Sequence, residues 1–313
     1  MSFTSLFSTI TTLFLLLVCG FLCGKLRIID ETGSKNLSTL IVKVGQPFMI
    51  ISSLIALECT AENLKTGGIM LALGAVIHVL LAVLSFLFAF PLRKNVNNRK
   101  LSEFAMVFTN CGFIGFPILK AIFGDIGLFY GAFYVVSFHL CTWTWGIVIL
   151  ARERSDIRLT VKKALINFGT IPSLIGFFLF LLPIPLPAAF TDFAVYLTNL
   201  CTPIAVLITG ANLSRRSLRK LFMNPYVYYV NLIRLLVLPL VITTLFWLVG
   251  LPDYLVVFGC VMTAMPTAAV ITMFGEMYDI EPGAAAEFVG STSILCTATL
   301  LPVISYANWL VGL

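Results

Sequence analysis

The sequence predicts an all-α polytopic membrane protein in which ten transmembrane helices form two inverted five-helix repeats, with helices 4 and 9 broken at a crossover. Three observations support this fold class: the apolar composition, the distribution of basic residues between apolar segments, and the spacing of four prolines. Of the 313 residues, 59% are apolar and 11% are charged, whereas soluble domains carry about 25% charged residues. The mean hydropathy of +1.03 excludes an ordinary soluble enzyme, a disordered chain and a secreted disulfide scaffold.

The length allows about ten membrane spans and leaves little for a soluble domain, because a spanning helix takes about 20 residues. Ten apolar runs bounded by charges or turn residues meet this requirement. The expected spans are residues 4–24, 37–57, 67–90, 102–119, 127–150, 163–183, 189–212, 225–249, 254–275 and 284–311. The fourth is the least helix-like, since it contains two glycines and a proline.

Basic residues orient these spans, because Lys and Arg favour the cytoplasmic loops. Sixteen of them follow spans one, three, five and seven, and the opposite loops hold only Lys65 and Lys120. The sixteen are Lys25, Arg27, Lys35, Arg93, Lys94, Arg99, Lys100, Arg152, Arg154, Arg158, Lys162, Lys163, Arg215, Arg216, Arg219 and Lys220. This alternation predicts a multi-pass protein of the cytoplasmic membrane with both termini outside the cytoplasm. The ninth connection is acidic, and acidic residues carry little topological weight.

Several other classes of protein are excluded by composition. The net charge of +6 comes from short loop clusters without an aromatic-rich face, so we expect no nucleic-acid partner. The eight cysteines form no C-x-x-C pair, which predicts neither disulfides nor a metal site, and we expect no cofactor. Residues 1–12 carry no Lys or Arg side chain, so the first apolar run is expected to be a mature span and not a signal peptide.

Four prolines divide the chain into two similar halves. Pro47 in span two corresponds to Pro203 in span seven, and Pro117 in span four corresponds to Pro266 in span nine. Both offsets are close to half the chain, as an inverted repeat of five spans requires. A proline in a helix removes one main-chain hydrogen bond, and broken backbone at membrane depth survives only against protein or a water-filled cavity.

The two strongest breaks are expected at Asn110-Cys-Gly-Phe-Ile-Gly-Phe-Pro117 and at Ala264-Met-Pro-Thr-Ala-Ala269. Such breaks present half-helix N-termini, whose free N–H groups attract anions. A simple proline kink explains either proline alone, but the symmetric pair favours a binding site.

These segments, together with Thr202-Pro-Ile-Ala-Val-Leu-Ile-Thr-Gly210, Tyr278-Asp-Ile-Glu-Pro, Ser291-Thr-Ser and Leu301-Pro302, resemble the auxin efflux carrier family of bacterial and plant transporters. The likeness runs in order over nearly the whole chain. The long cytoplasmic loop of some plant members is absent. The acidic and basic pair that plant carriers place near the start of span three is also absent, so specificity for auxin does not transfer.

The resemblance implies a first repeat over residues 1–150, a short cytoplasmic connector over 151–163 and a second repeat over 164–313. Spans 1, 2, 6 and 7 would form a scaffold that makes a homodimer, and spans 3–5 and 8–10 a transport domain that moves like an elevator. Asn110 would be a polar ligand of the substrate, and Pro117 and Pro266 the crossover points.

Charged and polar side chains inside the spans complete the candidate site, since such residues are functional candidates by default. Lys43 either faces an anion or reaches the cytoplasmic interface, and Arg234 is either the counter-charge of a carboxylate or a partner of freed carbonyls. The predicted substrate site comprises Asn110, Gly112, Gly115, Pro117, Met265, Pro266, Thr267, Arg234 and Lys43. The candidates for proton or ion coupling are His139, His78 and Glu287; each histidine is otherwise a packing residue.

The predicted function is secondary active transport of a small organic anion, a mono- or dicarboxylate of auxin-like or malate- or malonate-like type. The driving force is the membrane potential or a gradient of H⁺ or Na⁺. An anion channel or facilitator with the same fold is the alternative, because broken helices also line pores. An intramembrane enzyme is not expected, since the chain has only two histidines and neither H-E-x-x-H nor G-x-S-x-G.

Overall fold

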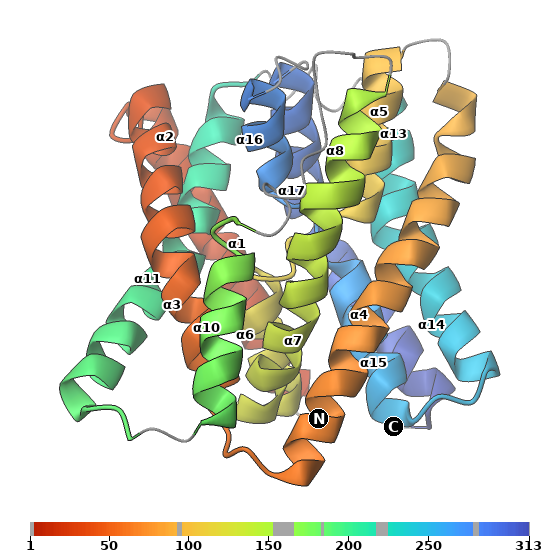
Figure 1. Ribbon diagram of the computed structural model, residues 1–313. Helices are drawn as coiled ribbons and strands as arrows, with labels where there is room; N and C mark the ends of the chain where they lie inside the picture. The colour runs from red at the N-terminus through yellow and green to blue at the C-terminus, as the bar shows by residue number, and fades with distance from the viewer. Residues whose placement is uncertain are drawn as a thin grey trace.

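The computed structural model describes residues 3–92, 96–152, 166–182, 185–216, 225–277 and 282–312. Over these ranges the chain is helical and contains no β-strand, apart from one isolated antiparallel bridge between Thr109 and Thr267. Most of the connector expected at 151–163, and the Tyr278–Glu281 part of the resemblance, lie outside the described residues. The helices stand side by side in one bundle (Figure 1).

Seven helical segments of the described chain are long and apolar enough to cross a membrane: Thr4–Lys25, Glu31–Leu54, Ala61–Phe88, Asp125–Leu150, Ala188–Ser214, Pro225–Leu248 and Ala284–Leu310. This confirms an all-α protein with several candidate membrane spans. The other three expected spans correspond to shorter helices. Two of those three spans are interrupted, and the third contributes only a 12-residue described helix, Thr170–Leu181.

The uninterrupted segments are built from α-helices joined, in three cases, by a wider π-helical turn. They are α1 (Phe3–Lys25), α2 (Glu31–Leu40), η1 (Ile41–Gly45), α3 (Gln46–Leu54), α4 (Ala61–Phe88), α7 (Asp125–Cys141), η3 (Thr142–Gly146), α8 (Ile147–Ala151), α10 (Thr170–Leu181), α11 (Ala188–Ser214), α13 (Pro225–Leu232), η4 (Ile233–Val237), α14 (Leu238–Leu248) and α17 (Pro282–Leu310). A 3-10 turn, η2 (Phe90–Leu92), follows α4.

Two of the wide turns lie directly before prolines. η1 ends at Gly45, directly before Gln46-Pro47, and η4 ends at Val237, directly before Leu238-Pro239. A proline cannot donate the helical hydrogen bond and crowds the preceding turn, so the wider turn accommodates it without ending the helix. Pro203 lies inside α11, which continues through it. The prolines at 47 and 203 therefore do not interrupt their helices.

The expected spans four and nine are interrupted. Residues 108–114 separate α5 (Val96–Val107) from α6 (Gly115–Phe123), and residues 265–269 separate α15 (Asp253–Ala264) from α16 (Val270–Met277). Pro266 lies in the second break. Pro117 lies in the first turn of α6, where a proline is tolerated because its N–H would have no helical partner. The first break thus coincides with the Asn110–Gly112 stretch and not with the proline.

A close helix crossing joins α1 to α11. A Cβ atom on Gly20 would meet the main chain of Leu207, and one on Gly210 would meet the main chain of Leu17. Gly24, four residues after Gly20 on the same face, likewise faces the main chain of α11. Small residues at this spacing let two membrane helices approach until their backbones touch, so these glycines set the distance between α1 and α11.

The helices pack in two groups. The first contains α1, α2, α3, α10 and α11, and the second contains α4 to α8 and α13 to α17. Where the groups meet, α6 and α17 pack against α1, α17 packs against α11, and α7 packs against α3 and α10. The interrupted segments therefore belong to one group and reach the boundary with the other.

Both chain termini lie at the same end of the bundle, the lower end in Figure 1, whereas α2 and α5 begin at the upper end. Arg215 follows the last residue of α11, and its guanidinium donates to the carbonyl of Ile29 at 2.8 Å and to the hydroxyl of Ser34 at 2.7 Å. These bonds tie the end of α11 to the turn between α1 and α2 and to the first turn of α2.

Candidate functional site

The two helix breaks are joined through their main chains. The amide of Asn110 donates to the carbonyl of Pro266 at 2.7 Å, and the amide of Ala268 donates to the carbonyl of Phe108 at 2.9 Å. This exchange is the antiparallel bridge between Thr109 and Thr267. Because each break supplies hydrogen-bond partners to the other, irregular backbone is sustained in an apolar interior where an unpaired peptide group is costly.

Arg234 holds the last turn of α15 in place. Its side chain is completely buried, and its two terminal nitrogens donate to the carbonyls of Thr263 at 2.6 Å and Met265 at 2.7 Å. A helix C-terminus leaves carbonyls unpaired and carries partial negative charge, so a guanidinium is well suited to this position. The η4 turn places Arg234 opposite these carbonyls. The sequence allowed two roles for Arg234, the counter-charge of a carboxylate or a partner of freed carbonyls. The hydrogen bonds show contact with freed carbonyls.

Hydroxyl groups pair with the rest of the second break. The hydroxyl of Thr267 donates to the carbonyl of Ala105 at 3.1 Å, and its amide donates to the hydroxyl of Thr292 at 3.1 Å. Thr263, on the last turn of α15, donates to the carbonyl of Gly259 at 2.7 Å. The threonines around Pro266 therefore cap main-chain groups inside the protein.

Main-chain amides without a partner in the described part of the chain lie at or just before the start of each helix that follows a break. Among the described residues, no hydrogen-bond partner is found for the main-chain N–H groups of Phe113 and Ile114, which precede α6, or of Ala269 and Val270, at the start of α16. Free N–H groups and the helix dipole together favour a negative charge at such a position. The carbonyl of Phe113 is occupied, because it accepts from the hydroxyl of Thr202 on α11 at 2.8 Å.

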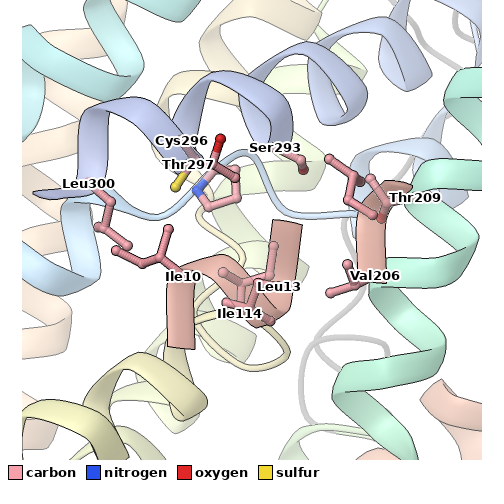
Figure 2. Close-up of a pocket in the computed structure, with 11 residues that line it drawn as sticks. Ile10, Leu13, Ile114, Val206, Thr209, Ser293, Cys296, Thr297 and Leu300 are labelled. Carbon is pink, nitrogen blue, oxygen red and sulfur yellow. The ribbon is translucent and has the colours of Figure 1, made fainter. Parts of the chain in front are cut away.

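A small cavity lies between the breaks and helices α1, α11 and α17. Its volume is about 30 Å³, which is room for one or two water molecules. Its walls are Ile10, Leu13, Leu17, Ile114, Val206, Thr209, Pro266, Ser293, Cys296, Thr297 and Leu300. Figure 2 shows Ser293, Cys296 and Thr297 approaching from α17, with Ile10 and Leu13 of α1 and Ile114 of the first break opposite.

The polar groups of this cavity come mainly from α17. Among the described residues the hydroxyl of Ser293 is buried without a hydrogen-bond partner, whereas the hydroxyls of Thr209 and Thr297 donate to carbonyls of their own helices. Sequence reasoning quoted the Ser291-Thr-Ser motif only for the resemblance and did not place Ser293 in the site. The position of Ser293 along its helix does not indicate which neighbours its side chain meets, because those depend on how α17 packs against the breaks.

Most of the predicted substrate residues lie at the two breaks or contact them, whereas Lys43 lies on η1. Asn110 is buried, and its side chain makes no hydrogen bond to the described residues. Gly112 faces Met49 of α3, and Gly115 begins α6. Lys43 is exposed, and its ammonium lies 5.7 Å from the ring centre of Phe168, a cation–π contact. Met265, Pro266 and Thr267 form the second break.

The candidates for coupling lie apart from the cavity walls. His139 on α7 is buried with its Nε2 atom 2.9 Å from Nε2 of Gln46 on α3, a contact between the two packing groups. His78 on α4 is buried with Nδ1 2.6 Å from the carbonyl of Gly74. Glu287 is partly buried near the start of α17. Among the described residues, no group of three or more His, Cys, Asp or Glu side chains is arranged to hold a metal ion.

The fold and the broken helices define a class of polytopic membrane protein, and comparison with known sequences gives the family. A sequence model described as "Membrane transport protein" matches residues 5–304, so the chain belongs to this family of transporters. This confirms the expected membership of the auxin efflux carrier family. The chain is also 22% identical over 307 residues to an uncharacterized transporter of Methanocaldococcus jannaschii, covering 95% of this chain and 96% of that protein. It is 23% identical over 309 residues to an uncharacterized transporter of Methanothermobacter thermautotrophicus, covering 97% of each.

Proposed function

We propose that this membrane transporter carries a small organic anion, a mono- or dicarboxylate, across the cytoplasmic membrane by alternating access. The observation that carries the proposal is the pairing of the two interrupted segments at Asn110 and Pro266. It brings the two breaks together at one cavity, whose walls include Ile114, just before α6, and Pro266 of the second break. An anion is favoured there because free N–H groups and positive helix ends stabilise negative charge.

We further propose ten membrane crossings in two inverted repeats, with the breaks forming a crossover. The two shared features of residues 96–123 and 253–277, a first helix of 12 residues and a short second helix after an irregular break, support the repeat. An even number of crossings agrees with both termini lying at one end of the bundle (Figure 1). The basic loops assign the opposite end to the cytoplasm, so both termini are proposed to lie outside it.

The size of the cavity and the two packing groups support alternating access. A space for one or two water molecules cannot take a dicarboxylate, so binding requires α1 and α11 to separate from the breaks. We propose that the first group, α1, α2, α3, α10 and α11, is a scaffold that also forms a homodimer. The second group is proposed to move against it as an elevator, with H⁺ or Na⁺ coupling through His139, His78 or Glu287.

Uptake into proteoliposomes tests the function. Radiolabelled malate, malonate and indole-3-acetate are offered to vesicles that hold the full chain, and the same measurement is made on protein-free vesicles. We expect at least one carboxylate to enter saturably and to be accelerated by the unlabelled compound on the opposite side. Flux that neither saturates nor responds to internal substrate identifies a channel. Movement of no carboxylate above the protein-free control contradicts the proposal.

A further inference from the structure

An apolar groove opens on the outer surface of the second packing group. It has a volume of about 410 Å³, within the range of ligand pockets in proteins. Its walls include Val79, Val83, Phe86 and Leu87 of α4, Val107 of α5 and Trp145 of η3. Both α4 and α8 pack against α5, and in Figure 1 α5 lies behind the space between α8 and α4.

The groove faces hydrocarbon and is one leaflet deep. Val79 is 62% exposed, Val83 56% and Leu87 59%, so the surrounding membrane reaches these side chains. The distance along α4 from His78, at the inner end of the groove, to Leu87 is about 14 Å at 1.5 Å per residue. One leaflet contributes about half of a 30 Å hydrocarbon core. The groove therefore has the depth of a single lipid chain that enters from the membrane surface.

The surface end of the groove is positively charged. The guanidinium groups of Arg99 and Arg152 lie 5.3 Å and 5.8 Å from the ring centre of Phe86. Both guanidiniums also bind one carboxylate oxygen of Glu103, at 2.9 Å and 2.8 Å. Two cations on one anion leave a net charge of +1, and the two arginine side chains are 21% and 28% exposed.

We propose that this groove binds a phospholipid, with an acyl chain along α4 and the phosphate at Arg99 and Arg152. The groove is apolar over the depth of one leaflet and ends at two guanidiniums. A phospholipid has the matching arrangement, an apolar acyl chain that leads to a charged phosphate. Arginine forms paired hydrogen bonds with phosphate oxygens, and basic pockets between membrane helices bind anionic lipid headgroups. The site lies on the outer surface of the bundle, so the proposal does not depend on which substrate is carried.

Native mass spectrometry of the delipidated full chain, titrated with dioleoyl phosphatidylglycerol, tests the acyl-chain part. Val83→Trp fills the groove, and Val76→Trp is the matched control, since Val76 lies on the same helix, is 49% exposed and is not part of the groove wall. We expect Val83→Trp to reduce the bound lipid at least fivefold and Val76→Trp to leave it unchanged. Ala82→Leu, a smaller change in the groove wall, replaces Val83→Trp if that variant does not fold.

The phosphate part is tested by Arg152→Gln against Arg216→Gln, an exposed arginine at the end of α11. We expect Arg152→Gln to weaken binding severalfold and Arg216→Gln to have no effect. Equal lipid binding by Val83→Trp and Val76→Trp overturns the proposal. So does unchanged binding by Arg152→Gln, which would identify a groove that accepts any apolar chain. A change of oligomeric state in Val83→Trp would show that the groove is a contact between copies of the chain, and overturns it too.

Discussion

The main-chain amide of Asn110 donates a hydrogen bond of 2.7 Å to the main-chain carbonyl of Pro266. This bond joins two breaks from opposite halves of the chain. It does not involve the side chain of Asn110, which has no hydrogen-bond partner among the described residues. The backbone of Asn110 thus has a structural duty, and its buried amide side chain remains available to a ligand. A substitution that keeps the main chain separates the two roles.

Asn110→Ala is expected to fold with nearly unchanged thermal stability, because the bond to Pro266 does not involve the side chain. Substrate binding is expected to weaken at least tenfold, or about 1.4 kcal/mol, the scale of one lost hydrogen bond. The measurement is the affinity for the carboxylate that the uptake screen identifies, with thermal unfolding in detergent as the check on folding. Asn199→Ala, at an exposed position on α11, is the control. Unchanged affinity would remove Asn110 from the substrate site.

Arg234→Met is expected to destabilise the protein, because the carbonyls of Thr263 and Met265 lose their donors in a completely buried place. Each unpaired buried group costs about 1–3 kcal/mol, so the midpoint of thermal unfolding should fall clearly. Arg216→Met, at an exposed arginine, should leave the midpoint in place.

Arg234→Lys distinguishes the two roles of this side chain. A lysine keeps the charge but lacks the planar fork that reaches two carbonyls at once. If Arg234 acts through the carbonyls alone, Arg234→Lys should lower stability and leave the substrate affinity of the folded fraction unchanged. A loss of affinity that is larger than the loss of stability would instead assign Arg234 to the counter-charge of the carboxylate.

Gly20→Ala is expected to disrupt the packing of α1 on α11, because its new Cβ would meet the main chain of Leu207. Backbone cannot move aside as a flexible side chain does, and overpacking of this kind costs about 1–3 kcal/mol or more. Gly68→Ala on α4 is the matched control, since a Cβ there meets nothing within 4 Å. It should stabilise the helix by up to about 1 kcal/mol. Thermal unfolding of both variants gives the comparison, and equal midpoints would contradict the tight crossing.

The contact between Gln46 and His139 allows a test of movement between the two packing groups. Their Nε2 atoms are 2.9 Å apart across α3 and α7. In a variant without native cysteines, Gln46→Cys with His139→Cys should be joined by a short bis-methanethiosulfonate, which links two thiols through disulfide bonds that a reductant can cleave. Elevator movement separates α3 from α7, so cross-linking should abolish exchange of labelled for unlabelled substrate, and a reductant should restore it. Exchange needs no ion gradient, so this readout does not depend on coupling through His139.

The two single-cysteine variants, treated with the same reagent, are the controls for that experiment. Each should keep the substrate exchange of its untreated form. Transport that continues at full rate in the cross-linked double variant would show that α3 and α7 remain together throughout the cycle, which contradicts the proposed division into scaffold and transport domain.

The sequence by itself determined the class of protein. An apolar content of 59% cannot be buried in a soluble core of this length, so spanning helices were the remaining possibility, and the family comparison agrees. It also indicated where helices would be interrupted, because glycine and proline weaken a helix through local chemistry. Pro47 and Pro203 show the limit of this reasoning: the helices continue through both, since a wider turn or neighbouring helices compensate for a lost hydrogen bond.

Only the tertiary structure decided what these breaks touch. The bridge between Thr109 and Thr267, the burial of Arg234 against carbonyls, and the place of Ser293 in the cavity depend on contacts between segments distant in sequence. The same holds for Arg99 and Arg152, which are loop charges that favour one side of the membrane in the sequence but share Glu103 at the end of an apolar groove. Local composition specifies how much of each helix surface is apolar. Packing specifies which polar groups from distant segments meet at that surface.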